Sequence, residues 1–307
     1  MKGICVFIVI VLFVVMWPIG VSANVTPLTT LSRLEELVYG ETRVGALVER
    51  VDRIEEDIYG SKQSGAVLTR IDNIHSFLDA NHTGTASIKL QLNLAEYGFS
   101  AKLTAGQPLI ERLDQLEIDL LGAVQPGSLS KRTRELMTTL WVTTQLDIKS
   151  LELREQTLVK IRLLTEVDSA NARVGDEVRY RVSEDVIVEG RIVIPAGSEG
   201  IGRVAEVTTA GMLGRDGRIV INFGMVSALD GSSIRLKMDA KATERNHSLE
   251  LAAGASMAGI LLLGPIGLVG GYFIRGRDVA IPVGTEFFVE TERTQNVIGF
   301  ILRPAQN

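Results

Sequence analysis

The sequence predicts an α+β protein, in which a helical repeat segment is followed by a small β-barrel or β-sandwich with an apolar, glycine-rich helical insert. Three observations support this fold class: a 20-residue repeat near the start, short alternating segments separated by glycine in the second half, and an uncharged run at residues 251–274 that contains six glycines. We therefore divide the chain into a signal peptide at 1–23, a helical repeat domain at 24–152, and a β-domain at 153–307 with its insert at 249–274.

Residues 1–23 have the three parts of a secretory signal peptide. Lys2 gives a short basic end, residues 4–16 form the apolar core, and small residues at Val21 and Ala23 favour cleavage directly afterwards. The alternative is an uncleaved anchor, but a membrane span needs about 20 apolar residues and this core is shorter. The only cysteine lies inside the signal, so the mature chain is expected to contain neither disulfides nor thiolate metal sites.

The helical half is predicted from an internal repeat. Residues 33–40 (Arg-Leu-Glu-Glu-Leu-Val-Tyr-Gly) return at 53–60 (Arg-Ile-Glu-Glu-Asp-Ile-Tyr-Gly), and a more diverged copy lies at 116–122. Each copy is typical of an apolar helix that ends at a glycine, because glycine accepts the left-handed conformation that closes many helices. One such helix cannot bury its apolar stripe alone, so stacked copies are expected to share a core.

The second copy shows the expected faces of these helices. Its apolar residues recur at the spacing of one helix face, and they are Leu47, Val51, Ile54 and Ile58. Its charged residues are assigned to the opposite, solvent-exposed face, and they are Glu49, Arg50, Arg53, Glu55 and Glu56. The same interpretation covers Glu35 and Glu36 in the first copy, so both carboxylate pairs are expected to form exposed ion pairs.

Tyr39 and Tyr59 recur one residue before the terminal glycine of two copies. One interpretation is that they are ligand aromatics, forming a ladder that binds a glycan or a peptide. The other interpretation is that they are repeated packing residues, because aromatic side chains at helical spacing commonly fill cores. The sequence leaves both interpretations open.

Two further segments complete the helical half. Apolar and polar residues alternate at 88–94, as in a strand, but the following Glu96-Tyr97-Gly98 matches the end of the helical unit and favours a helix. Residues 128–151 are predicted to form one long helix with Trp141 packed on its inner side. The other inner residues are Leu136, Leu140, Leu146 and Leu151.

The β-domain is predicted from the alternation that begins at Thr157. Short strands are expected at 159–163, 178–182, 192–194, 201–207, 219–223 and 234–236, with glycines between them at hairpin turns. Many short strands with glycine-rich turns are typical of a barrel or a sandwich. The phrase Ile-Pro-Ala-Gly-Ser at 194–198 returns as Ile-Pro-Val-Gly-Thr at 281–285, and each copy predicts a corner between two strands.

These two phrases, together with Val-Gly-Asp-Glu-Val at 174–178, resemble a widespread extracytoplasmic bacterial β-domain of uncharacterised role. They are more distantly similar to the β-barrel of the outer-membrane channel subunit of type IV secretion, in which an apolar helical pair is inserted between strands. The resemblance implies an envelope-type β-domain. Its motifs are turn signatures without catalytic content, and this chain lacks the long proline-rich linker of the secretion subunit.

The insert is the predicted site of membrane contact or self-association. Small residues stand four apart in it, which lets helices approach closely in lipid. Its predicted site residues are Ala255, Gly259, Gly264, Pro265, Gly267 and Gly271. Flanking polar residues are interpreted as interface anchors, and they are Arg245, Asn246, His247, Arg275 and Arg277. The alternative is a glycine-rich loop packed against the barrel or the helical half.

No catalytic residue, cofactor site or metal site is predicted. Ser128 and Lys131 have the spacing of penicillin-recognising enzymes, but a Lys-Thr-Gly motif is absent from the sequence and Ser128 suits a helix start. Residues 200–205 fit the loose dinucleotide fingerprint, yet a strand follows where that fingerprint needs a helix. The three histidines, His75, His82 and His247, lie far apart in the sequence.

These observations predict an exported, non-catalytic envelope protein of the periplasm or outer envelope, whose helical repeats act as a binding or spacer module. The expected partner is a membrane or another envelope component, or a second copy of the chain in a homo-oligomer. Nucleic acid is not expected, because the formal net charge is −5 and basic residues do not cluster. One alternative is a soluble periplasmic or secreted binding module with the insert buried, and a weaker alternative is a cell-wall hydrolase.

Overall fold

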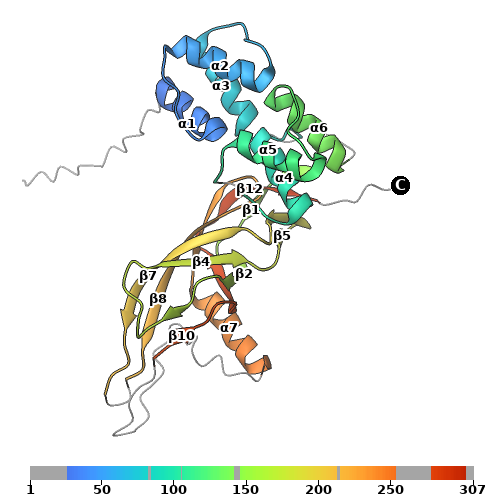
Figure 1. The fold of residues 1–307 in the computed structure, drawn as a ribbon. Helices are drawn as coiled ribbons and strands as arrows, with labels where there is room; N and C mark the ends of the chain where they lie inside the picture. Colours follow the sequence, from blue (N-terminus) through green and yellow to red (C-terminus); the bar gives the residue numbers. More distant parts are fainter. Residues whose placement is uncertain are drawn as a thin grey trace, which may run out of the picture.

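The computed structural model describes residues 26–81, 84–104, 106–141, 146–212, 215–253 and 278–301. The expected α+β class is confirmed, because helices fill the first half and strands the second (Figure 1). The predicted signal peptide and all six predicted site residues of the insert lie outside the described residues. The first residues of the insert, up to Ala253, belong to helix α7.

The repeat extends further than the sequence predicted. Helices begin at residues 27, 47, 67, 88, 109 and 129, so a period of 20 or 21 residues runs through the whole helical half. The six helices are α1 Pro27–Tyr39, α2 Leu47–Tyr59, α3 Val67–Leu78, α4 Ile88–Ser100, α5 Leu109–Leu121 and α6 Leu129–Trp141. The predicted glycine stops are confirmed at Gly40, Gly60 and Gly122, whose φ angles lie between 79° and 85°.

The prediction of an exposed charged face is wrong for Glu35, Glu55 and Arg50, which are buried. Arg50 donates two hydrogen bonds to Glu35, at 2.9 and 2.6 Å, and the glutamate is 1% exposed. The Glu35 carboxylate also accepts a hydrogen bond from the backbone N–H of Arg43 in the following loop. We call this unit the glutamate–arginine clasp. Equivalent clasps join Glu55 to Arg70, Glu96 to Arg112 and Glu117 to Arg132.

The clasp explains why charged residues lie inside the array. Each arginine comes from the first turn of one helix and each glutamate from the end of the preceding helix, so the pair fixes the loop between them. A buried charge is tolerated when it is paired and fully hydrogen bonded. At the equivalent positions of α3 and α4 the residues are His75 and Gln91, so the clasp motif does not join these two helices. The array therefore consists of two clasped triplets, α1–α3 and α4–α6.

Residues 88–94 form a helix, as the repeat favoured. Their strand-like alternation arises because α4 is covered on more than one side. Leu90, Leu92 and Leu94 are all fully buried, and α4 packs against both α5 and α6. Its remaining face lies against the β-half, where Asn93 donates to the carbonyl of Leu229 at 2.6 Å.

The expected β-barrel is present, and a second sheet adjoins it. The closed barrel has the order β11-β2-β4-β7-β8-β9. Its strands are β2 Leu158–Leu163, β4 Glu177–Val182, β7 Glu199–Thr208, β8 Arg218–Ser227, β9 Ser233–Lys237 and β11 Glu286–Thr291. The second sheet has the order β1-β12-β6-β5, with β1 Ile148–Leu153, β12 Gln295–Phe300, β6 Arg191–Ile194 and β5 Val186–Val188. A short ladder pairs β3 Val167–Asp168 with β10 Ala280–Ile281.

The predicted long helix at 128–151 is wrong in its second half. Helix α6 ends at Trp141, and Leu151 lies in β1, where it pairs with Val297 of β12. Leu146 precedes this strand, and Trp141 packs against Phe300 at 5.9 Å between ring centroids. The apolar spacing of 146, 151 and 153 suits a strand that is buried on one side as well as it suits a helix. Hydrophobic periodicity alone does not distinguish a helix from a strand in this segment.

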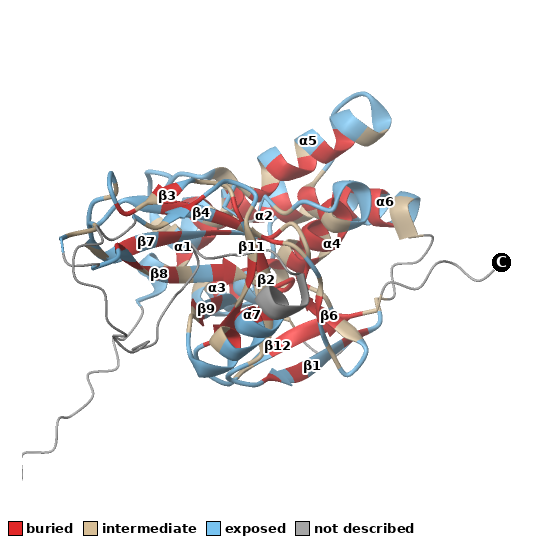
Figure 2. Cartoon of the chain, turned by 90° about the horizontal axis from the view of Figure 1, so that it is seen from below, coloured by how far each residue is buried: buried red, intermediate tan, exposed pale blue. Residues whose placement is uncertain are grey.

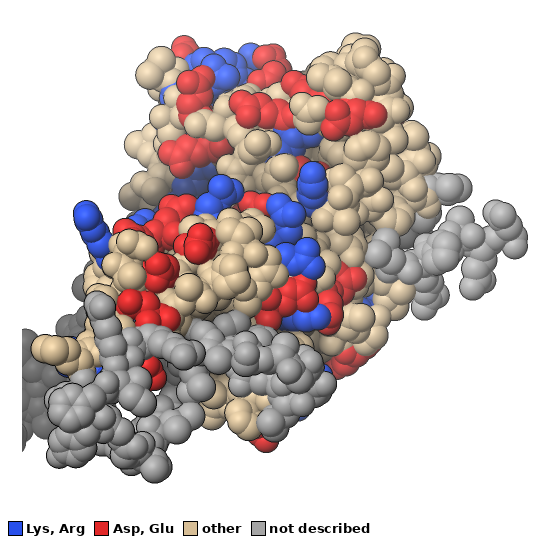
Figure 3. Space-filling view, turned by 60° about the horizontal axis from the view of Figure 1, so that its bottom comes forward, with Lys and Arg blue, Asp and Glu red and all other residues tan. Residues whose placement is uncertain are grey.

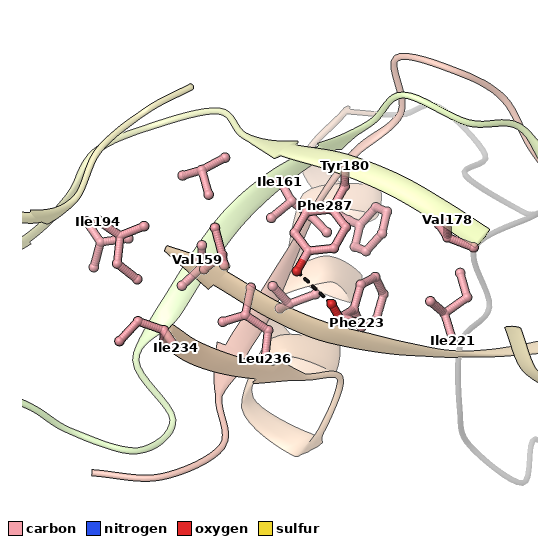
Figure 4. Close-up of a cluster of buried hydrophobic side chains, with 14 of the residues drawn as sticks. Val159, Ile161, Val178, Tyr180, Ile194, Ile221, Phe223, Ile234, Leu236 and Phe287 are labelled. Carbon is pink, nitrogen blue, oxygen red and sulfur yellow. Dashed lines mark hydrogen bonds between the residues drawn. The ribbon is translucent and has the colours of Figure 1, made fainter. Parts of the chain in front are cut away.

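The barrel interior is filled by side chains. Figure 4 shows Tyr180, Phe223 and Phe287 pointing toward one another inside the wall, with the Tyr180 hydroxyl donating to the carbonyl of Phe223 at 2.7 Å. The Phe223 ring meets the other two rings edge-on, at 5.9 and 5.8 Å. Burial raises the pKa of Tyr180, so this hydroxyl stays protonated and remains a donor. The barrel is a packed core, as in other small barrels.

The helical half shares a core with the second sheet, and the barrel has a core of its own. The helical core includes residues of the second sheet, namely Ile148, Ile298 and Phe300, as well as Leu229 from the loop between β8 and β9. Figure 2 shows buried residues both along α4 and along β6, β12 and β1. Tyr97 adds a polar contact, because its hydroxyl donates to the carboxylate of Asp185 at 2.7 Å.

Candidate functional site

The predicted insert begins beside the shortest strand pairing of the closed barrel. Strands β9 and β11 close the barrel through only two residue pairs, Glu290 with Lys237 and Thr291 with Leu236. Beyond these pairs, helix α7 Ala240–Ala253 packs against β11 (Figure 1). Asn246 takes the place of a neighbouring strand there. Its side-chain amide accepts the backbone N–H of Phe288 at 2.7 Å and donates to the carbonyl of the same residue at 2.9 Å.

The start of α7 is fixed by a second polar contact. Glu290 is fully buried, and one of its carboxylate oxygens accepts the backbone N–H of Ala242 at 2.9 Å. A carboxylate is favourable at this end of a helix, because the N-terminal amides lack partners within the helix. Arg245 extends the contact, with its guanidinium 5.4 Å from the centroid of the Phe288 ring.

The interpretation of Asn246 as a membrane-interface anchor is therefore wrong. Asn246 is 7% exposed and bound to Phe288 of β11, and Arg245 lies over the ring of the same phenylalanine. His247 is exposed. Arg275 and Arg277 lie outside the described residues.

The chain returns from the insert at another fixed point. The carboxylate of Asp278 accepts the Ser169 hydroxyl at 2.9 Å and the Ala210 backbone N–H at 2.8 Å. Strand β10 then pairs with β3. Both points at which the insert joins the described structure are thus held on the β-half by hydrogen bonds. Within the described residues, no helix combines the length and apolar character that crossing a membrane requires.

The two repeat tyrosines have different environments. The Tyr39 hydroxyl donates to Asp57 at 2.7 Å, and the Arg43 guanidinium lies 4.5 Å from its ring centroid. Burial and the Asp57 hydrogen bond both raise the pKa of Tyr39. The Tyr59 ring instead packs against Phe77 at 5.0 Å, and burial raises the pKa of Tyr59 to about 12. Each tyrosine therefore meets a different kind of partner, and the ladder for a glycan or a peptide stays a prediction.

A pocket of about 470 Å³ lies beside Tyr39, in the size range of small-molecule sites. It is bounded by the ends of α1 and α2 and by the beginnings of α5 and α6. Its polar lining consists of Tyr39, Arg43, Glu56, Asp57, Glu111, Ser128 and Arg132. Val38, Pro108, Ile110 and Leu129 provide the apolar part.

The other chemical motifs have structural explanations. Ser128 precedes α6 and its hydroxyl contacts Ser130, whereas Lys131 faces Glu135 at 3.8 Å. Residues 200–205 lie within strand β7, as the sequence indicated. His75 and His247 are exposed, and His82 is outside the described residues. In the described part of the chain, no group of three potential metal ligands comes together.

The barrel wall carries ion pairs of mixed sign, such as Lys160 with Glu184 at 2.6 Å and Arg181 with Glu199 at 2.6 Å. In the view of Figure 3, basic and acidic side chains are interspersed. This face is unlike the clustered basic surface that phosphate backbones require.

Sequence reasoning gave Asn246 the wrong role and missed Glu290 and Arg43. Asn246 lies in the polar flank of the insert, and the barrel edge that it binds is formed far away in the sequence. Glu290 lies in a strand that the sequence indicated only as the continuation of the second Ile-Pro corner, without bounds. The repeat alignment could have drawn attention to Asp57, because the next copy has Phe77 at the equivalent position.

No protein-family model matches the sequence. No curated protein matches it either. Among solved structures, the chain is similar to ComB10 of the Com type IV secretion system of Helicobacter pylori, with 18% identity. The match covers 50% of this chain and 97% of ComB10, and its TM-score is 0.27. A similarity at this level assigns neither a fold family nor a function.

Proposed function

We propose that the chain is a non-catalytic protein of the cell envelope that docks at a membrane through its glycine-rich insert. The helical repeats serve as its binding module, and self-association of the insert is the other contact that the composition favours. The observation that carries this proposal is that both ends of the insert are fixed to the β-half by hydrogen bonds. Asn246 and Glu290 hold helix α7 against β11, and Asp278 accepts two hydrogen bonds where the chain returns.

The composition of the insert supports the same role. Residues 254–274 carry no charge and contain glycines four apart, a pattern that favours close helix contact in lipid. The barrel core is already filled by its own side chains, including three buried aromatic rings. The insert is therefore more readily explained by a contact outside the barrel than by a place in its core.

The test is replacement of residues 254–277 by a short Gly-Ser linker, which leaves α7 and β10 in place. The wild-type chain is expected in the membrane fraction after export, and the linker variant in the soluble fraction. Chemical crosslinking of both proteins measures self-association in the same samples. The thermal unfolding of the variant is expected to match that of the wild type, because the contacts of Asn246 and Glu290 are retained.

Two results would contradict the proposal. A wild-type protein that is fully soluble and monomeric after export would eliminate both membrane docking and self-association. A linker variant that still sediments with membranes would place the contact elsewhere in the chain.

The soluble binding module is the second candidate, and the pocket beside Tyr39 favours it. In that case ligand binding by the helical half would persist in a protein that never associates with membranes.

A further inference from the structure

We propose that the pocket beside Tyr39 binds a small zwitterion, namely an amino acid or short peptide with a free ammonium and a free carboxylate. The inference rests on the binding role proposed for the helical half, and it assigns that role to one pocket and one ligand chemistry. The pocket is lined by two acidic side chains from the end of α2 and by an arginine that follows α1. This distribution of charge matches a ligand with two opposite poles.

The repeat itself separates this pocket from ordinary packing. Tyr39 and Tyr59 occupy the same position in consecutive units, and each meets the residue 18 positions later. For Tyr59 that residue is Phe77, and the two rings pack together at 5.0 Å. For Tyr39 it is Asp57, whose carboxylate is exposed and borders the pocket. A polar group therefore stands where the neighbouring copy has an aromatic contact.

Asp57 and Glu56 are suited to binding an ammonium group. The Asp57 carboxylate accepts one hydrogen bond from Tyr39, which leaves acceptor capacity for a ligand. Glu56 lies beside it, and its basic neighbour Lys62 is 3.9 Å away and 55% exposed. Exposed ion pairs of this kind are weak, so Glu56 can exchange its partner for a ligand ammonium.

Arg43 is suited to the carboxylate. Its backbone N–H is fixed by Glu35 of the clasp, and its guanidinium is positioned over the Tyr39 ring. Its ion pair with Glu41 is 3.3 Å long and lies on the surface. Arg132 also lines the pocket, but its guanidinium is already bound to Glu117 and Asp114. Arg43 is thus the arginine of this pocket that can bind a ligand carboxylate, which arginine does with two parallel hydrogen bonds.

The remaining lining fits a small side chain. Pro108, Ile110 and Leu129 contribute apolar surface to the same pocket. A dipeptide with small side chains satisfies the two poles and this surface together. A glycan would satisfy the aromatic ring of Tyr39 but would leave both poles unpaired.

The test is isothermal titration of the purified exported chain with the dipeptide Ala-Ala. Binding is expected, and acetylation of the amino end or amidation of the carboxyl end is expected to weaken it about tenfold each, the value of one charge-assisted hydrogen bond. Arg43→Gln and Asp57→Asn are expected to weaken binding of the unmodified dipeptide by a similar factor. Tyr39→Phe is expected to weaken it less, because it removes only the group that orients Asp57.

Matched controls come from the neighbouring repeat. Tyr59→Phe removes the equivalent hydroxyl, which lies outside the pocket lining, and is expected to leave dipeptide affinity unchanged. Lys62→Gln removes the competing partner of Glu56 and is expected not to weaken binding. Equal binding of the free and the doubly blocked dipeptide would overturn the proposal. Binding of chitotriose in place of Ala-Ala would overturn it in favour of a glycan site, and binding of neither probe would overturn it as well.

The outcome is independent of membrane docking. The linker variant lacking residues 254–277 is expected to bind Ala-Ala with wild-type affinity. Failure of dipeptide binding in a membrane-associated protein would therefore reject this inference and leave the proposed function standing. Dipeptide binding by a fully soluble protein would support this inference and reject membrane docking.

Discussion

At the scale of single residues, the duplicated Ile-Pro-x-Gly turn is used in two ways. Gly197 and Gly284 have φ angles of 90° and 89°, so both occupy the left-handed region. At Gly197 a side chain would overlap the carbonyl oxygen of Ala101, which follows α4, whereas at Gly284 the space is open. The first turn is one of the places where α4 and the residues directly after it meet the β-half. The second has the same backbone without this contact.

This pair gives a matched test of the contact between the halves. Gly197→Ala and Gly284→Ala both place an alanine at positive φ, at a cost of about 1–3 kcal/mol each. Gly197→Ala is expected to lower the free energy of unfolding by about 1–3 kcal/mol more, because its Cβ also displaces the α4 end. Urea unfolding of both variants measures the difference. Equal destabilisation would mean that the α4 end moves aside without cost.

At the scale of elements, the clasp determines how one helix follows another. Its arginine and glutamate are buried, and the glutamate also holds the connecting loop through a backbone N–H. The glycine stops and the apolar stripes could be predicted from sequence, because both are local patterns. The clasp could not, since a glutamate pair beside arginines has the composition of an exposed helix face. Only the stacking of the next copy covers it.

Arg70→Met tests the energetic role of a clasp. The variant leaves Glu55 buried without its charge partner, so the free energy of unfolding is expected to fall by about 3–5 kcal/mol. The double variant Glu55→Gln/Arg70→Met is expected to be more stable than the single variant, because it removes the unpaired charge and keeps an acceptor for the Gln63 N–H. Lys62→Met serves as the control at an exposed ion pair, with an expected cost below about 1 kcal/mol. Urea denaturation provides all three values, and a single variant as stable as this control would show that the clasp is dispensable.

At the scale of the whole molecule, the halves are expected to unfold together. The helical core continues into the second sheet, and Asn93 joins the two by accepting from Arg112 and donating to the Leu229 carbonyl. Trp141 is a natural probe of this junction, since it contacts Phe300 and the only other tryptophan lies in the predicted signal. Its fluorescence and the far-ultraviolet circular dichroism are expected to change at the same denaturant concentration. Two separate midpoints would show that each half is stable alone.

The fold class and most strands of the barrel followed from local periodicity and from turn glycines. The second sheet was largely missed, because β5 is three residues long and β1 was read as the end of a helix. The candidate pocket needed the structure, since Tyr39, Asp57 and Pro108 come from three separate units. The contact of Asn246 in α7 likewise depends on the edge of β11, which lies more than forty residues later in the sequence.

The way in which Asn246 replaces a strand has a mechanical consequence. A tension applied to the chain beyond Ala253 would be transmitted along α7 and would load the two Asn246 bonds to Phe288 as well as the Glu290 bond to Ala242. Those few bonds would break before the continuous ladders elsewhere in the wall. The barrel would then expose unpaired backbone groups on β11. Tension on the insert would thus open an edge of β11, which lies more than forty residues from Asn246 in the sequence.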